Sequence, residues 1–285
     1  MKKGIYPGLG MSDYHGWKLD KTDLAAGPIS CSMLKDFRKN PFAWAKTSAR
    51  KSTASLRTGS LFDAVLTDAD WQDQIVEPEY DSYRTNVAKA WKAEMEAEGK
   101  LIVKPEDLAH AVAGADAVRN HKVAGAILEG AEFQVGVVGE VAGIPAKCLI
   151  DILPSKDGDY AETIVDYKTT ANGLSDDDLA RTIGKWGYHL QASFYRSLFN
   201  QVSDDRHCEE FIFIFQDTAT LEVRVIYLDS VDLVRGNSMI ASAVAEFKDA
   251  AENGIRSRYA DGIDPISLPD WQAGVEDGEL EKRGM

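Results

Sequence analysis

Three short segments rich in β-branched residues follow one another in the middle of the chain, and they constrain the fold more than any other feature. They are Glu132–Val141, Ala146–Leu153 and Glu162–Lys168. The sequences between them, Gly143-Ile144-Pro145 and a run of Ser-Lys-Asp-Gly-Asp, have the composition of turns. Because short turns join antiparallel neighbours, the pattern predicts a three-stranded meander.

Helical segments precede and follow this meander. Ser30 and Ser32 are candidate N-caps for a helix that stops at Asn40-Pro41, and Pro41 suits the first turn of the next helix. Apolar periodicity predicts further helices over 60–66, 86–98, 105–129, 176–200 and 230–253, and strands over 211–215 and 222–228. This order predicts an α/β fold with a central mixed sheet flanked by helices and an N-terminal helical layer.

We expect a single domain over residues 1–285, because no repeat or low-complexity linker divides the chain. Residues 1–28 are rich in Gly, Asp and Pro and predict an extended arm, while residues 259–285 form an acidic tail. No apolar run reaches the about 18 residues of a membrane helix, and no apolar segment follows the N-terminal lysines as in a secretory signal. Three isolated cysteines fit a reducing cytoplasm: Cys31, Cys148 and Cys208.

The formal net charge of −14 is unevenly distributed. Residues 35–57 carry seven basic side chains against one acidic side chain, Asp36. The acidic total argues against a nucleic-acid partner, and a basic run is most often a solvated helix face. Screening confines charge effects to about 8–10 Å, however, so the basic segment is also a candidate anion-binding surface.

Two carboxylates and an ammonium group fall on neighbouring strands of the predicted meander. Asp166 and Lys168 are two residues apart on one strand, so their side chains leave the same face about 6.6 Å apart. A hairpin would bring Asp151, near the end of the preceding strand, beside Asp166. Burying Asp151 unpaired would be costly, so a cation or a basic partner is required. Oxygen ligands suit Mg²⁺, and Lys168 would orient or help to deprotonate a bound water.

The helix that follows carries a polar and aromatic stripe. Tyr188, Gln191 and Tyr195 are spaced three and four residues apart and therefore share a face. The stripe fits two interpretations equally well. One is an ordinary contact between helix and sheet, and the other is a set of hydrogen bonds from Gln191 and Tyr195 to a phosphate beside the metal ions.

Taken in order, these motifs resemble a known family. Asp151, Asp166-Tyr167-Lys168, Gln191 and Tyr195 are similar to the D…DxK…QxxxY pattern of the RecB-type branch of the PD-(D/E)xK nuclease superfamily. Within that branch, nearly all of the 285 residues resemble the RecE (exonuclease VIII) nuclease domain of phages and prophages. The matching segments also include GIY, SDYH, PISCSML, GSLFDAVL, EPEYDSYRTNVAKAW, IVDYKTT, YHLQASFY and ISLPDW.

The resemblance implies a Mg²⁺-dependent 5′→3′ exonuclease that acts on double-stranded DNA ends and leaves a 3′ single-stranded overhang for recombination by annealing. It implies two metal ions per site, with Mn²⁺ as the alternative to Mg²⁺. It also implies a RecT-like annealing protein as partner and a homo-oligomer in the form of a tetrameric ring. A phage- or prophage-encoded protein in the cytoplasm of a bacterial host is expected, without a membrane partner.

The resemblance also implies roles for single residues. Asp151 and Asp166 would bind metal together with the carbonyl of Tyr167, and Lys168 would be the catalytic lysine, with Gln191 and Tyr195 completing the catalytic set. Glu132 matches a family glutamate near the metals, although an exposed acid at the start of a strand is an equal alternative. Asp63 stands where the family has a metal-binding histidine. The predicted DNA-binding residues are Arg50, Lys51, Arg57 and Lys147.

Two other functions stay open. A nuclease of the same fold could act as an endonuclease or on single-stranded DNA, since fold does not fix substrate. A non-catalytic DNA-end-binding subunit would be expected to lack Asp151, Asp166 or Lys168, and all three are present. The scattered histidines make no zinc spacing, and no four-cysteine cluster exists for an iron–sulfur centre.

Overall fold

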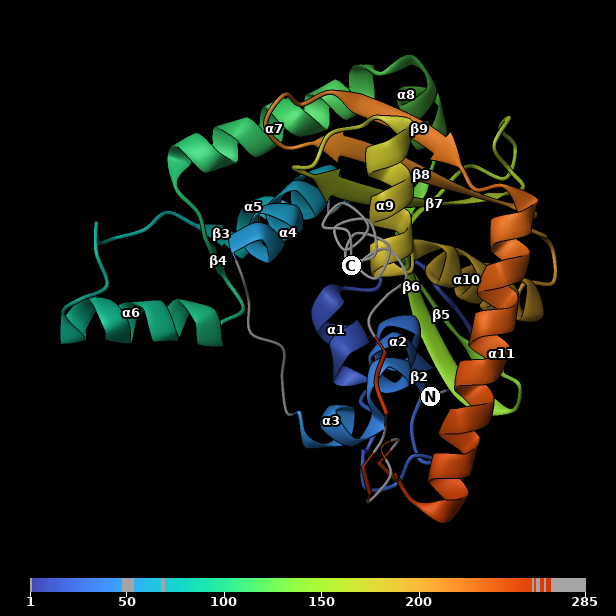
Figure 1. The fold of residues 1–285 in the computed structure, drawn as a ribbon. Helices are drawn as coiled ribbons and strands as arrows, with labels where there is room; N and C mark the ends of the chain where they lie inside the picture. Colours follow the sequence, from blue (N-terminus) through green and yellow to red (C-terminus); the bar gives the residue numbers. More distant parts are fainter. Residues whose placement is uncertain are drawn as a thin grey trace, which may run out of the picture. The chain divides into compact units, whose positions relative to one another are not determined.

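The computed structural model describes residues 2–47, 54–67, 70–257, 259, 262–263 and 265–267. The chain divides into two units, Met1–Ile255 and Arg256–Met285. All helices and strands given below belong to the first unit, which Figure 1 shows coloured along the sequence.

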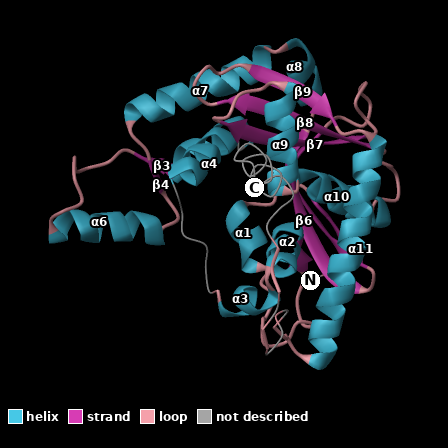
Figure 2. Cartoon of the chain, in the orientation of Figure 1, coloured by secondary structure: helices cyan, strands magenta, loops and turns pink. Residues whose placement is uncertain are grey.

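A mixed sheet lies at the centre of this unit (Figure 2). Its strands β5, β6 and β7 are antiparallel neighbours, which confirms the predicted meander, whereas β7 and β8 run parallel. The strand order is β1 (Gly4–Tyr6), β5 (Glu132–Val141), β6 (Ile144–Leu153), β7 (Thr163–Thr170), β8 (Glu210–Asp217) and β9 (Val223–Tyr227), and β2 (Ile29–Ser30) pairs with β6.

The helices are α1 (Met11–Gly16), α2 (Cys31–Lys39), α3 (Pro41–Lys46), α4 (Ala54–Thr67), α5 (Trp71–Gln74), α6 (Asn86–Ala97), α7 (Pro105–Asn120), α8 (Lys122–Leu128), α9 (Asp176–Trp186), α10 (Tyr188–Val202) and α11 (Ser230–Asn253). A second sheet of two strands joins β3 (Ile75–Val76) to β4 (Leu101–Ile102). Within the part of the chain that the structure describes, no helix combines the length and the apolarity needed to cross a membrane.

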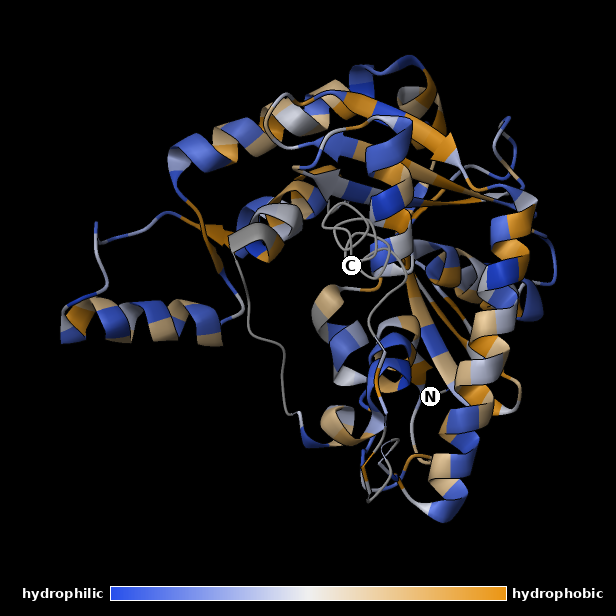
Figure 3. Ribbon diagram, viewed as in Figure 1, coloured by the Kyte–Doolittle hydropathy of each residue, from blue (hydrophilic) through white to orange (hydrophobic). Residues whose placement is uncertain are grey.

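Alternate side chains of β8 enter two hydrophobic cores, one on each face of the sheet. Phe211, Phe213 and Phe215 pack in the core that includes side chains of α2, α3, α10 and α11. Ile212 and Ile214 pack in the core that includes side chains of α4, α7 and α8. Side chains of a strand alternate in direction, so one strand reaches both cores, and helices cover the sheet on both faces. Figure 3 shows the apolar colour along the strands.

The starts of α2 and α3 follow from their capping residues, of which Ser30 was predicted and Asn40 was not. Ser30 Oγ accepts a hydrogen bond from the N–H of Met33 at 3.4 Å. Asn40 ends α2, and its Oδ1 accepts from the N–H of Ala43 at 2.8 Å, with Pro41 as the first residue of α3. These contacts satisfy backbone donors that the first turn of a helix leaves open.

Two helices that we predicted to be continuous are broken, which corrects the predictions over 105–129 and 176–200. Gly187 has a left-handed conformation, with φ of 63°, and separates α9 from α10. A residue without a Cβ atom adopts this conformation at no steric cost. His121 is extended between α7 and α8, and its Nδ1 accepts from the N–H of Ala124 at 3.2 Å.

The N-terminal residues are less extended than the composition predicts. Gly4–Tyr6 pair antiparallel with β5 at the edge of the sheet, and Met11–Gly16 form the short helix α1. The rings of Tyr6 and Trp17 meet edge to face, with centroids 5.5 Å apart. The open edge of β5 supplies backbone partners for this arm, which its own Gly- and Pro-rich sequence does not indicate.

Candidate active site

Strand β7 presents Asp166 and Lys168 on the same face of the sheet, as their spacing predicts. The Asp166 side chain is 1% exposed, and its Oδ2 forms an ion pair with Lys168 Nζ. Its other oxygen, Oδ1, accepts a hydrogen bond from Gln191 Nε2 of α10 at 2.7 Å. Two donors from different elements therefore hold the orientation of this carboxylate.

Asp151 belongs to β6, and its side chain lies beside that of Asp166 on β7. The register between these strands includes one residue pair, Ile152 with Val165. Next to this pair, Asp151 Oδ2 accepts the backbone N–H of Tyr167 at 3.1 Å, so a side chain satisfies this strand donor. The tyrosine side chain itself packs in the opposite core and donates its hydroxyl to Gln216 Oε1.

The charged groups of this cluster shift one another's pKa values. Burial raises the pKa of Asp151 well above its usual range, and the carboxylates of Asp166 and Asp63 raise it further, while Lys168 opposes them. Burial by itself would lower the pKa of Lys168, but Asp166 and Asp151 outweigh it and raise that pKa above its usual value. Lys168 is therefore a cation among an excess of carboxylates.

This donor set fits a hard divalent cation. Mg²⁺ is commonly held by one or two carboxylates, with water and substrate phosphate as its remaining ligands. Asp151 and Asp166 provide two neighbouring carboxylates, and a bound cation would offset their negative charge in this buried position.

The two further candidate metal ligands are placed differently. Asp63 of α4 lines the same cavity as Asp151 and Lys168, and its charge acts on Asp151. Glu132 is exposed at the first residue of β5, opposite Leu153, and is not one of the described residues that line the cavity. In the described ranges, no group of three or more His, Cys, Asp or Glu side chains could hold a metal ion. Asp63 thus lies near the pair without completing a group of three.

Gln134 links β5 to the end of α4, and sequence reasoning missed it. It lies between Phe133 and Val135, which pair with Ile152 and Ile150 on either side of Asp151, and its φ of 51° is unusual for a residue with a side chain. Gln134 Nε2 donates to Thr67 Oγ1 at 2.8 Å, and Thr67 Oγ1 donates to the carbonyl of Asp63 at 2.9 Å. The strand that faces Asp151 thereby holds the backbone of Asp63, through a strained residue that no motif marks.

Asp151 and Lys168 open into a cavity of about 720 Å³ that is lined by α2, α4, β7 and the break between α9 and α10. Of the described residues that line it, three are acidic, Asp36, Asp63 and Asp151, and five are basic: Lys35, Arg38, Lys39, Lys168 and Lys185. On a chain with a net charge of −14, this is a local concentration of positive charge. The cavity therefore suits an anionic substrate.

Three of the predicted DNA-binding residues are not among the described residues that line this cavity. Arg50 and Lys51 lie outside the described residues. Arg57 is exposed on α4, but it lines a second cavity, of about 1030 Å³, instead of the one that contains Asp151. The basic segment thus contributes to the candidate site through Lys35, Arg38 and Lys39 of α2, which sequence reasoning did not single out.

The expectation that Lys147 faces DNA phosphate is wrong. Its side chain is buried, and its Nζ donates to the carbonyl of Tyr14 at 2.6 Å and to the carbonyl of Trp17. The ammonium also lies 4.2 Å from the centroid of the Tyr14 ring. Burial lowers the pKa of Lys147 to about 8. This lysine attaches the end of α1 to β6.

The three side chains of the stripe on α10 have different surroundings. Gln191 Nε2 donates a hydrogen bond to Asp166, so Gln191 positions a carboxylate instead of contacting a phosphate directly. Tyr195 packs against the core that includes α10, with its ring centroid 6.3 Å from that of Phe211, and burial raises its pKa well above the usual value. Tyr188 lines the cavity, and Lys168 Nζ lies 5.2 Å from its ring centroid.

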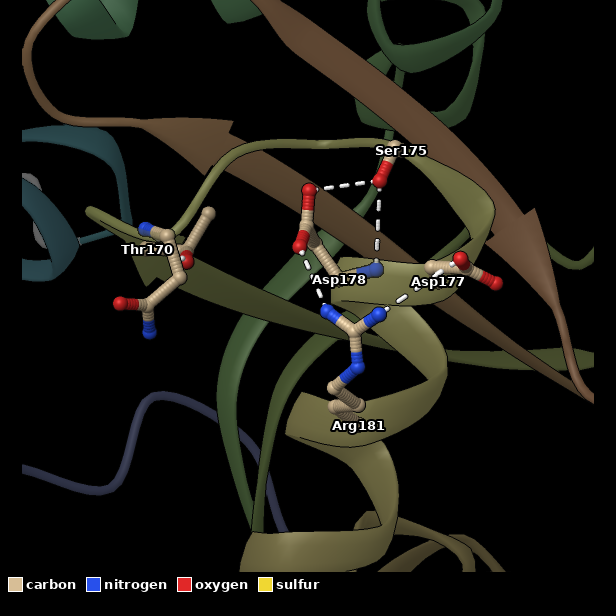
Figure 4. Close-up of polar contacts among 6 residues, drawn as sticks. Thr170, Ser175, Asp177, Asp178 and Arg181 are labelled. Carbon is tan, nitrogen blue, oxygen red and sulfur yellow. Dashed lines mark hydrogen bonds and ion pairs between the residues drawn. The ribbon is translucent and has the colours of Figure 1, made fainter.

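Polar contacts fix the beginning of α9 (Figure 4). Ser175 Oγ accepts from the N–H of Asp178 at 3.2 Å and donates to its Oδ2 at 2.5 Å. Arg181 forms ion pairs with Asp178 at 3.2 Å and with Asp177 at 3.5 Å. This capping arrangement sets the start of the helix whose last turn forms part of the cavity wall.

Comparison with known proteins identifies the family. Residues 30–269 match the family described as a PDDEXK-like domain of unknown function, DUF3799. The crystal structure of a provisionally named exonuclease from Eubacterium rectale is similar over 93% of this chain and 98% of that chain, with a TM-score of 0.59 and 19% identity. At this identity the likeness shows the fold alone. No curated protein sequence matches the chain.

A phage-related exonuclease from Haemophilus somnus aligns over 68% of this chain and 95% of its own at 15% identity, and its TM-score of 0.32 gives it no weight. The family match covers most of the chain, and the mixed sheet flanked by helices confirms the predicted fold class. The chain belongs to the PDDEXK-like family DUF3799, within the PD-(D/E)xK nuclease superfamily.

Proposed function

We propose that this protein is a Mg²⁺-dependent 5′→3′ exonuclease that acts on double-stranded DNA ends and leaves 3′ single-stranded overhangs. The observation that carries the proposal is the cluster of Asp151, Asp166 and Lys168, of which Asp151 and Lys168 line a cavity with an excess of basic side chains. Carboxylates alone would repel a DNA phosphate, whereas carboxylates that hold cations beside a basic wall would attract it.

Asp151 and Asp166 would hold the divalent ions, two per site, with Asp63 as a further carboxylate that lines the same cavity and acts on Asp151. Ions bound there would supply charge neutralisation at the scissile phosphate and a water of lowered pKa for in-line attack. Gln191 keeps Asp166 in a fixed orientation. Lys168, whose raised pKa keeps it protonated at neutral pH, stabilises negative charge on the reacting phosphate and orients the attacking water.

The finer parts of the proposal rest on the resemblance to the RecE exonucleases. They are the 5′→3′ polarity, the use of Mg²⁺ with Mn²⁺ as the alternative, the RecT-like annealing partner and the tetrameric ring. The location in the cytoplasm of a bacterial host and the phage or prophage origin also rest on this resemblance. An endonuclease or a single-strand nuclease on the same fold is the competing function.

Linear duplex DNA labelled at either the 5′ or the 3′ end tests the proposal, with Mg²⁺ or EDTA, alongside closed circular duplex. We expect early loss of the 5′ label in Mg²⁺, late loss of the 3′ label, no cleavage in EDTA and an intact circle. Early loss of the 3′ label would contradict the polarity. Linearisation of the circle would favour the endonuclease.

A further inference from the structure

An exposed tryptophan stands at the wall of the active-site cavity. Trp186 is the last residue of α9, its side chain is 51% exposed, and it lines the same cavity as Asp151 and Lys168. Tryptophan is highly buried on average, so an indole left open beside a candidate catalytic cluster is informative. The mechanism proposed above makes no use of it.

The backbone that carries this indole contacts Lys35 of α2. Gly187 turns the chain with φ of 63°, and a Cβ atom at this position would come within 3.2 Å of Lys35 Cδ. Lys35 Nζ of α2 donates to the carbonyl of Trp186 at 2.9 Å. α2 thus holds the backbone at the break between the two helices, next to the indole.

Basic groups alternate with aromatic rings along this wall. Lys185 Nζ lies 5.3 Å from the centroid of the Trp186 ring. The ring of Tyr188 has Lys168 Nζ at 5.2 Å and Lys35 Nζ at 5.9 Å from its centroid. Aromatic side chains that accept bases, set among cations that track the phosphate backbone, are the combination by which proteins bind single-stranded nucleic acid.

We propose that the break between α9 and α10 is a binding subsite for an unpaired nucleobase. Trp186 stacks on a base of the strand whose phosphate lies at Asp151 and Asp166, while Lys35 and Lys185 contact its backbone phosphates. The inference rests on the proposed function and deepens it, because it names the substrate in the cavity as a strand end that is separated from its complement. A base inside a duplex is stacked on both faces, so a fully paired interior base could not use this indole.

The test is a binding measurement without hydrolysis. Oligonucleotides that carry the fluorescent base 2-aminopurine at the 5′ terminus or at an interior position are titrated with protein, in EDTA and in Ca²⁺, as single strands and as frayed duplexes. We expect quenching that is strongest near the 5′ terminus and is largely lost in Trp186→Ala, with affinity weakened about 5- to 150-fold. Trp186→Phe should keep part of the quenching, and Tyr227→Ala, which removes an exposed aromatic ring from β9, should leave it unchanged.

An abasic nucleotide at the same position separates stacking from a structural effect. Removing the base should weaken binding to the wild type as much as Trp186→Ala does, and it should have little further effect on that variant, because the two changes delete one contact. Equal quenching by wild type and Trp186→Ala, or fully additive losses, would overturn the subsite. Cleavage without stacking refutes the subsite alone, and stacking without Mg²⁺-dependent cleavage refutes the proposed nuclease alone.

Discussion

At the scale of single residues, the candidate site depends on how each carboxylate is held. Asp166 has Lys168 on one oxygen and Gln191 on the other, and Asp151 accepts the N–H of Tyr167. Asp63 is fixed through its backbone, by Thr67 and Gln134. The carboxyl groups of Asp166 and Asp151 are therefore held directly by hydrogen bonds or an ion pair. For Asp63, the contacts with Thr67 and Gln134 hold the backbone instead.

Asp63 and Glu132 compete for the role of further metal ligand, and substitution distinguishes them. Asp63→Ala should raise the Mg²⁺ concentration required for cleavage by about tenfold or more, since it removes a carboxylate that lines the cavity. Glu132→Ala should leave the Mg²⁺ titration unchanged, because its side chain is exposed at the start of β5. The reverse result would assign the ligand to Glu132 and leave Asp63 a structural role.

Lys147 predicts a pH dependence of stability. Burial lowers the pKa of Lys147 from 10.5 in the unfolded chain to about 8 in the folded protein. Between these values the unfolded chain binds more protons, so this residue makes the free energy of unfolding rise with pH from about 8 to about 10.5. Denaturant unfolding of the wild type and of Lys147→Met at pH 7, 8.5 and 10 measures the effect.

The wild type should gain stability relative to Lys147→Met as the pH rises through this window. The lost hydrogen bonds to Tyr14 and Trp17 add an offset between the two proteins, and buried tyrosines and cysteines titrate in both, so the slope of the difference carries the information. A difference that is independent of pH would mean that Lys147 keeps its ordinary pKa in the folded protein.

At the scale of elements, the break between α9 and α10 matters most for the site. It brings the last turn of α9 and the first turn of α10 to the same cavity, so that Trp186 and Tyr188 both line it. A continuous helix over 176–200, which the sequence pattern favours, would rotate these two side chains about 200° apart at the usual 100° per residue. The left-handed residue between them is what brings the rings to one wall.

Gly187→Ala tests the break. The substituted residue would have to keep a left-handed conformation, which costs about 1–2 kcal/mol, and its Cβ would press on Lys35. Denaturant unfolding should record that loss, and binding of single-stranded DNA should weaken with it. Gly184→Ala is the matched control: a Cβ there meets nothing within 4 Å, so alanine should stabilise the helix by up to about 1 kcal/mol. Equal effects of the two substitutions would refute the account.

Much of the element pattern could be predicted from the sequence. The strand Glu132–Val141 and the helix Ser230–Asn253 have the predicted bounds, since turn residues and a capping Asp229 mark their ends. The spacing of Asp166 and Lys168 predicted their shared face. By contrast, Lys147 looks like a surface cation because its partners, the carbonyls of Tyr14 in α1 and of Trp17 just after it, are 133 and 130 residues away in sequence. Pairing across such separations leaves no local pattern.

At the scale of the whole molecule, folding brings Asp151 of the sheet and five basic side chains to one cavity of an acidic chain. Folding buries Asp151 beside Asp166, with Asp63 nearby, at a cost in free energy: burial, and then the two neighbouring carboxylates, raise the pKa of Asp151. A bound cation offsets this cost in the folded state alone. We therefore expect the site to lower the free energy of unfolding of the protein until a cation is bound.

Mg²⁺ should consequently stabilise the protein. At a concentration 100-fold above its Kd, a ligand that binds the folded state alone adds about 2.7 kcal/mol to the free energy of unfolding. Thermal unfolding with and without Mg²⁺ should give a higher Tm for the wild type and a much smaller gain for Asp151→Asn. Asp205→Asn, which alters an exposed carboxylate outside the cavity, should respond as the wild type does. An identical gain in all three proteins would mean that the ion stabilises from elsewhere.

The most direct test of the central claim is the single-turnover rate at which a 5′-labelled linear duplex is cleaved as Mg²⁺ is varied. Asp166→Asn and Lys168→Ala should lower the maximal rate by at least about 100-fold while both proteins stay folded, because each removes a charge that acts at the scissile phosphate. Lys156→Ala, which removes an exposed lysine outside the cavity, should cleave as the wild type does. Rates within about tenfold of the wild type in both site variants would contradict the assignment of Asp151, Asp166 and Lys168 as the hydrolytic centre.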